Sequence, residues 1–261
     1  MHFCFNDFNI YYEKHGEGKT PIIILPGWGN TRETFTHLVS FLKETFSVYI
    51  LDYPGFGNSI FPNRDLTIDD YANFIKSFIE INSIEAPIVI SHSFGGRIAT
   101  LLNTKYEVRF KKLILMDSAG IKPKKSITKL IKQTTYKLLK KVAYILPYNC
   151  KQKYLNKLIK IFGSTDFKNL DTNIRKTFIN IVNTDLTKHI KNIKCDTLLL
   201  WGELDKDTPL KDAYKMNKLI NDSGLVIIKK SGHFPYLENP HHVGRIIYEF
   251  IKVFATKKSI D

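Results

Sequence analysis

Hydrophobic residues along this chain fall into two patterns, short continuous runs and longer stretches with helical spacing. The continuous runs lie at 21–25, 48–51, 88–90, 113–116, 197–201 and 225–228. They are rich in Ile, Val and Leu, which is typical of buried β-strands. Apolar residues recur at helical spacing over 31–46, 68–81, 210–220 and 243–254, and again directly after Gly96. Thr67 stands where the second of these helices needs an N-cap.

Strands and helices therefore alternate along most of the chain. Residues 2–14 mix aromatic with polar residues and predict an antiparallel hairpin ahead of this alternation. Helices that connect parallel strands cover both faces of their sheet. The pattern thus predicts an α/β fold, a mostly parallel sheet of about eight strands flanked by helices. In such sheets, sites lie beyond the carboxyl ends of the strands.

The residues that follow the 88–90 run carry the first chemical candidate. They read Ser-His-Ser-Phe-Gly-Gly over 91–96, so Ser93 lies between a strand and a helix and has small residues two positions to either side. This matches the nucleophile elbow, G-x-S-x-G, with Ser91 in place of the first glycine. Small neighbours are needed there because strand and helix pass close together. A plain strand-to-helix turn with a hydroxyl at its tip is the alternative interpretation.

Two further candidates follow late strands in the same way. Asp205 comes shortly after the 197–201 run, and His233 follows the last run. The order Ser93, Asp205, His233 is the order of an α/β-hydrolase triad, in which the histidine is the general base and the acid orients it. Asp117, at the end of the 113–116 run, is the alternative acid. We expect Asp207 to cap the helix that follows it.

An oxyanion hole needs two main-chain N–H groups, one from the residue after the nucleophile and one from the turn after an earlier strand. These requirements nominate Phe94 and Trp28. Trp28 belongs to a Pro-Gly-Trp-Gly turn at 26–29 that directly follows the 21–25 run. Trp28 is also suited to line a pocket wall, and the two roles are compatible because only its amide would be catalytic.

Five motifs in order and spacing resemble the α/β-hydrolase family with a helical cap, across nearly the whole chain. They lie at 25–29, 52–59, 91–96, 202–205 and 232–235. One departure is Pro26, which stands where the family usually has histidine. The motifs at 25–29 and 52–59 most resemble the carboxylesterase branch that includes pimeloyl-acyl-carrier-protein methyl ester esterase.

The resemblance implies a core at about 1–120 and 191–261, with a helical cap at about 121–190. It also implies hydrolysis of a carboxylic ester or thioester through an acyl-enzyme, without a metal or an organic cofactor. One alternative is the same triad used for C–C bond hydrolysis, lyase chemistry or perhydrolysis. A second alternative is a non-catalytic member of the fold that binds a ligand in its capped pocket.

Charge is concentrated in the expected cap. The formal net charge is +14, and residues 118–165 hold twelve lysines and no acidic residue, which leaves +2 for the rest of the chain. Apolar residues at helical spacing make these segments amphipathic helices with lysine-rich outer faces. A solvated lysine face is one interpretation. The other is a surface for an anionic partner, with the candidate residues Lys129, Lys132, Lys140 and Lys141.

An anionic partner of this kind would be an acidic acyl-carrier protein, a coenzyme A thioester or an anionic membrane surface. Nucleic acid is not expected, because the chain has no nucleic-acid-binding motif. No apolar stretch reaches membrane-spanning length, and the N-terminus lacks the pattern of a signal peptide. The three scattered cysteines, Cys4, Cys150 and Cys195, predict reduced thiols in a cytoplasmic protein.

Overall fold

The computed structural model describes residues 1–122, 127–162 and 174–255. The chain divides into two compact units. The core unit comprises Met1–Ile121 and Thr184–Asp261, and the helical unit comprises Lys122–Asn183. None of the described helices is both long and apolar enough to cross a membrane.

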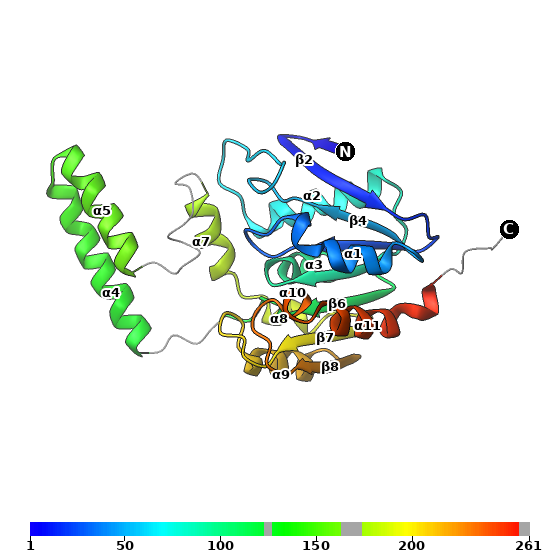
Figure 1. Ribbon diagram of the computed structural model, residues 1–261. Helices are drawn as coiled ribbons and strands as arrows, with labels where there is room; N and C mark the ends of the chain where they lie inside the picture. Colours follow the sequence, from blue (N-terminus) through cyan, green and yellow to red (C-terminus); the bar gives the residue numbers. More distant parts are fainter. Residues whose placement is uncertain (123–126, 163–173, 256–261) are drawn as a thin grey trace. The chain divides into compact units, whose positions relative to one another are not determined.

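The core unit is built on one eight-stranded sheet with the order β1-β2-β4-β3-β5-β6-β7-β8 (Figure 1). The strands are β1 (His2–Phe5), β2 (Phe8–His15), β3 (Pro21–Leu25), β4 (Ser47–Leu51), β5 (Ile88–His92), β6 (Lys112–Met116), β7 (Thr197–Gly202) and β8 (Ser223–Ile228). The β1–β2 and β2–β4 pairs are antiparallel, and all other pairs are parallel. The expected mostly parallel sheet with an N-terminal hairpin is confirmed.

The strand order reverses direction around β3. The chain moves from β3 to β4 on one side and then crosses back to β5 on the other, with Leu25 of β3 opposite Ser91 of β5. A reversal of this kind leaves a crevice at the carboxyl ends of the two strands. The turn after β3 and the elbow after β5 therefore start side by side.

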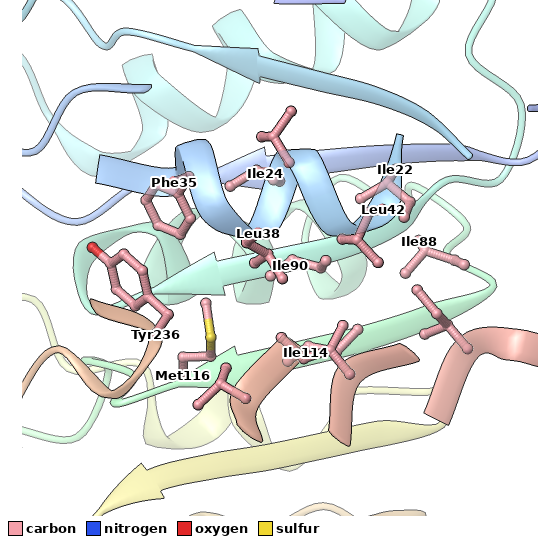
Figure 2. Packing of buried hydrophobic residues seen from close by; sticks show 14 of the residues in the cluster. Ile22, Ile24, Phe35, Leu38, Leu42, Ile88, Ile90, Ile114, Met116 and Tyr236 are labelled. Carbon is pink, nitrogen blue, oxygen red and sulfur yellow. The ribbon is translucent and has the colours of Figure 1, made fainter. Parts of the chain in front are cut away.

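The helices of the core unit cover both faces of the sheet (Figure 1). They are η1 (Arg32–Phe35), α1 (Thr36–Leu42), α2 (Ile68–Ile81), α3 (Phe94–Thr104), α8 (Thr187–Ile190), α9 (Leu210–Leu219), α10 (Pro235–Glu238), α11 (Pro240–Ile251) and η3 (Lys252–Phe254). Side chains from α1 and α11 pack on one face of the strands, where Leu38, Ile90 and Ile114 are buried (Figure 2). Helices α2 and α3 contact each other outside this cluster.

Two predicted helices differ from the observed ones at their ends. The helix expected over 31–46 is a 3-10 turn followed by α1, which ends at Leu42. The chain then turns, with the Phe46 N–H donating to the Leu42 oxygen at 3.1 Å, and this carries the fully buried Phe46 into the core ahead of β4. Helix α11 begins at Pro240, before the expected 243, because proline is favoured in the first turn of a helix.

The N-terminus of α2 is as predicted. The Thr67 hydroxyl accepts from the Asp70 N–H, and the Asp70 carboxylate accepts from the Thr67 N–H, which completes a capping box.

The helical unit contains α4 (Ile127–Val142), η2 (Ala143–Ile145), α5 (Tyr148–Phe162) and α7 (Arg175–Asn183). The four lysines proposed as an anionic-partner surface all belong to α4, and the side chains of Lys140 and Lys141 are exposed. The observed unit starts and ends within the expected 121–190 boundaries, while α8 belongs to the core unit. A role as a cap stays a prediction.

Candidate active site

Ser93 lies at the sharp turn between β5 and α3. Its backbone has φ 48° and ψ −108°, a conformation that L-residues adopt only when their surroundings enforce it. Three main-chain hydrogen bonds supply that constraint. The Ser93 N–H donates to the main-chain oxygen of Met116 at 3.0 Å. The main-chain oxygen of Ser93 accepts from the N–H groups of Gly96 at 3.1 Å and Ala119 at 3.0 Å. The turn is thus pinned to the end of β6.

The small residues around Ser93 have specific contacts. A Cβ on Gly95 would overlap the main-chain oxygen of Leu25, and one on Gly96 would overlap the hydroxyl of Ser118. Ser91, which replaces a glycine of the usual motif, is fully buried, and its hydroxyl donates to the Ile114 oxygen at 3.0 Å. The departure from the motif is therefore accommodated by a hydrogen bond to the neighbouring strand.

The structure brings Ser93, His233 and Asp205 together in a chain of hydrogen bonds. His233 Nε2 lies 3.0 Å from Ser93 Oγ, and His233 Nδ1 lies 2.8 Å from Asp205 Oδ2. A carboxylate can only accept, so Nδ1 carries the proton and Nε2 is free to accept one from the serine. The His233 side chain is 13% exposed, which leaves its ring within reach of a bound molecule.

Asp205 is buried and accepts several hydrogen bonds. Its Oδ1 receives the main-chain N–H groups of Asp207 at 2.8 Å and Thr208 at 3.1 Å. Its Oδ2 lies 2.6 Å from the Thr208 hydroxyl as well as against His233. Burial alone would raise the pKa of Asp205, but the hydrogen bonds from His233 and Thr208 outweigh it and hold this pKa at about 2. Asp205 is therefore charged at neutral pH.

Asp207 does not cap the following helix. Helix α9 has Pro209 at its N-cap position, with no hydrogen bond from a side chain to the helix N-terminus. The expectation that Asp207 caps this helix was wrong, because the N-cap position lies two residues farther along the chain; Asp207 instead donates its main-chain N–H to Asp205.

The loop that carries His233 is held by the end of β7 and by Glu238. A Cβ on Gly202 would overlap the main-chain oxygen of Gly232, so the end of β7 and the His233 loop pass very close to each other. The loop is also held by Glu238, which accepts from the Gly232 N–H at 2.7 Å and from the Ser231 hydroxyl at 3.0 Å. The sequence gives no local signal for Glu238, since its role depends on the turn into α10.

The alternative acid, Asp117, lies beside Asp205 but makes different hydrogen bonds. It ends β6 and is fully buried, and its Oδ1 accepts the Gly202 N–H at 2.9 Å. Carboxyl oxygens of Asp117 and Asp205 and a ring nitrogen of His233 all lie within 4.8 Å of one another. Of the two acids, Asp205 has the hydrogen bond to the imidazole.

The two oxyanion candidates, Trp28 and Phe94, lie on neighbouring elements. Their rings meet edge to face with centroids 5.3 Å apart. Phe94 is the first residue of α3, where main-chain N–H groups have no acceptor within the helix and the dipole favours negative charge. Trp28 directly follows Gly27, where a Cβ would overlap the ring of His92. The turn after β3 is thus packed against the elbow.

A model of the alpha/beta hydrolase family matches residues 22–243, which is most of the chain. The chain belongs to the alpha/beta hydrolase family. This hydrolase is 27% identical over 259 residues to the pimeloyl-[acyl-carrier protein] methyl ester esterase of Wigglesworthia glossinidia brevipalpis, with 92% of this chain and 96% of the relative covered.

Other relatives of the hydrolase differ in their reactions. It is 24% identical over 271 residues to a 2-hydroxy-6-oxo-6-phenylhexa-2,4-dienoate hydrolase of Comamonas testosteroni, covering 95% of this chain and 92% of that one. A thermophilic esterase from Thermogutta terrifontis has the same fold, with a TM-score of 0.72, 20% identity and 95% of each chain covered. The chain therefore has the alpha/beta hydrolase fold, and its relatives include both a methyl ester esterase and a dienoate hydrolase.

Besides Glu238, a second residue beside the candidate site was not singled out in the sequence analysis. His92 precedes Ser93 and is fully buried, and its Nε2 lies 2.7 Å from the His233 oxygen. Burial, reinforced by the nearby His233, lowers the pKa of His92 to about 3, so it is neutral and Nε2 donates to that oxygen. The only sequence signal was its place beside the serine in the elbow.

Proposed function

We propose that this hydrolase cleaves a carboxylic ester or thioester through an acyl-enzyme formed on Ser93. The observation that carries the proposal is the 3.0 Å contact between Ser93 Oγ and His233 Nε2, with the opposite ring nitrogen bound to a charged acid. This arrangement activates a hydroxyl for attack on an acyl carbon.

In the first half-reaction, Ser93 Oγ bonds to the acyl carbon while His233 Nε2 takes the hydroxyl proton. The oxyanion that forms is held by the N–H groups of Trp28 and Phe94. It collapses as the bond to the leaving oxygen or sulfur breaks, and His233 returns the proton to that atom. In the second half, His233 takes a proton from water as the water attacks the acyl carbon. The bond from that carbon to Ser93 Oγ then breaks, His233 returns the proton to Oγ, and a carboxylic acid is released.

Two observations favour an acyl group delivered on an anionic carrier. The first is the name of a relative that spans nearly the whole chain, an esterase of an acyl-carrier-protein ester. The second is the run of twelve lysines without an acidic residue over 118–165, most of it in the helical unit. We assign this unit the role of a cap that recognises the carrier, with Lys129, Lys132, Lys140 and Lys141 as its contact residues.

The test is the hydrolysis of p-nitrophenyl esters from acetate to dodecanoate. Ser93→Ala should abolish turnover, whereas Ser40→Ala, at an exposed serine of α1, should not change it. Labelling by a fluorophosphonate reports serine activation independently of the substrate. Labelling without ester turnover, combined with cleavage of a 2-hydroxy-6-oxo-dienoate, would favour C–C hydrolysis. Neither labelling nor turnover would favour a ligand-binding protein.

A further inference from the structure

A second carboxyl group lies beside the proposed triad and has one of its oxygens unaccounted for. Asp117 is fully buried at the end of β6, and its backbone has a φ of 42°, in the left-handed region. Its main-chain N–H donates to the Leu200 oxygen at 3.0 Å, and its Oδ1 accepts from the Gly202 N–H. Within the described residues, Oδ2 is buried and no donor reaches it. A carboxylate held this way would have half of its charge uncompensated.

Charges on Asp117 and Asp205 would repel each other, because the two carboxyl groups are near neighbours in a buried place. Their carboxyl oxygens lie within 4.8 Å, and both side chains are buried. In such a pair, repulsion and the loss of hydration leave a proton on one acid. Asp205 accepts two main-chain N–H groups, one hydroxyl and the imidazole, whereas Asp117 accepts a single N–H. The proton therefore belongs on Asp117.

We propose that Asp117 is a neutral carboxylic acid whose Oδ2–H donates to the Asp205 carboxylate, and that it thereby positions the triad acid. The inference rests on the proposed function, because it assigns Asp117 a role that acts through Asp205. One proton accounts both for the oxygen without a donor and for the close approach of the two acids. Asp117 is a positioning residue, since it does not contact Ser93 or the ring of His233 through a hydrogen bond in the described part of the chain.

The surroundings of Asp117 agree with this state. Burial, followed by the hydrogen bond to Asp205, raises the pKa of Asp117 to about 10. Other titratable groups that act on it or feel its charge are Glu238, Tyr236 and His233. Glu238 adds a further negative charge and favours the neutral form. The Gly202 N–H favours the ionised form, but it is outweighed.

The first test is the stability of Asp117→Asn against pH. In the parent, folded Asp117 keeps its proton up to about pH 10, whereas unfolded aspartate loses it near its ordinary value of 3.8. The parent is therefore stabilised at low pH and loses this contribution as the pH rises between these values. Asparagine does not titrate, so the variant does not lose this contribution. Its unfolding temperature should therefore rise relative to that of the parent as the pH increases. A difference that is independent of pH would overturn the proposal.

The second test is made on the parent itself, so it does not depend on the folding of a variant. In protein with 13C-labelled aspartate carboxyls, one resonance should keep the protonated shift through neutral pH. The same resonance should be absent from Asp117→Asn. If every aspartate carboxyl titrates below neutral pH, Asp117 is ionised and the proposal fails. Neither this nor the unfolding measurement requires turnover, so failure of the proposed function would be distinguishable.

Activity then tests the positioning role. Asn keeps a donor toward Asp205, so Asp117→Asn should retain kcat/KM within about threefold. Asp117→Leu removes the donor and should lower kcat by about tenfold or more with little change in KM, because hydrogen bonds to charged groups are the stronger ones. Equal losses in Asn and Leu variants that remain folded would show that the donated hydrogen bond is not what matters.

Discussion

His92 Nε2 donates a 2.7 Å hydrogen bond to the main-chain oxygen of His233. The two rings also lie close, with centroids 4.8 Å apart. Because His92 directly precedes Ser93, this bond joins the elbow to the loop that carries the proposed base. Two contacts therefore hold Ser93 and His233 near each other: their own hydrogen bond, and the bond from the neutral, buried imidazole of His92.

His92→Phe should lower the unfolding free energy at neutral pH by about 1–3 kcal/mol, since it leaves the main-chain oxygen of His233 without its donor. The parent should lose stability as the pH falls from the ordinary histidine pKa of 6.5 toward about 3, because unfolded His92 binds a proton that the folded chain excludes. The deficit of the variant should therefore shrink with acid. Urea unfolding of the parent and the variant at several pH values measures this difference in stability.

The matched control is His37→Phe at an exposed histidine of α1, which should change neither the stability nor its pH dependence. A deficit for His92→Phe that stays the same from pH 7 to acid would mean that folded His92 accepts a proton after all.

Asp205→Asn should reduce kcat by about a thousandfold or more, because the amide favours the wrong imidazole tautomer and cannot stabilise the charged ring. Asp207→Asn is the matched control, since Asp207 is exposed and contributes its main-chain N–H to the site. Ester turnover and circular dichroism of both variants would check the prediction. Similar losses in the two variants would move the acid role away from Asp205.

The parts of the site that the sequence predicted are those that follow local rules. Apolar runs predict the strands, and small residues predict the elbow. Motif spacing predicts the loops that carry Asp205 and His233. The roles of His92, Glu238 and Asp117 depend on which loops become neighbours when the strands align. Asp117 approaches Asp205 because Met116 of β6 pairs with Leu200 of β7, and no local pattern encodes that register.

The boundaries of elements were predicted less well for a related reason. The expected helix over 31–46 has a continuous helical pattern, yet contacts with other parts of the chain decide where the observed helix starts and ends. The Arg32 N–H donates to Asp52 Oδ1 at 2.9 Å, and Phe46 is needed in the core. Tertiary contacts override local periodicity at both ends.

Gly95→Ala should destabilise the core unit by about 1–3 kcal/mol and lower turnover, since the added Cβ would overlap the Leu25 oxygen and force α3 away from β3. Gly224→Ala in β8 is the matched control, because nothing lies within 4 Å of the position of its Cβ. Thermal unfolding of both variants compares the two sites. Equal behaviour would mean that the elbow can shift to admit the methyl group.

Asp52→Ala should lower the unfolding free energy by about 3 kcal/mol or more. Asp52 is fully buried, pairs with the Arg32 guanidinium and accepts the Asn58 N–H at 3.1 Å, so its loss leaves Arg32 with Glu13 as its remaining close acid and leaves main-chain donors without an acceptor. The control is Asp7→Ala, whose ion pair with Arg64 is exposed and should contribute less than about 1 kcal/mol. Chemical denaturation would separate these values, and a small effect at Asp52 would show that water or Glu13 replaces it.

Charge reversal of Lys129, Lys132, Lys140 and Lys141 to glutamate should raise KM for an acyl ester on an acidic carrier protein and leave KM for p-nitrophenyl butyrate unchanged. The physical reason is that the complementary field that steers and orients an anionic carrier is lost, while a neutral ester does not feel it. Raising the salt concentration should likewise raise the KM of the parent for the carrier ester and leave its KM for p-nitrophenyl butyrate unchanged.

The control for net charge is an equal reversal in the core unit, at the exposed residues Lys211, Lys215, Lys218 and Lys229. It changes the total charge by the same amount, so a local surface and a general charge effect give different results. If both quadruple variants raise KM for the carrier ester equally, only the overall charge matters. If the helical-unit variant impairs both substrates equally, its lysines support folding of the unit, and the solvated lysine face is the better interpretation.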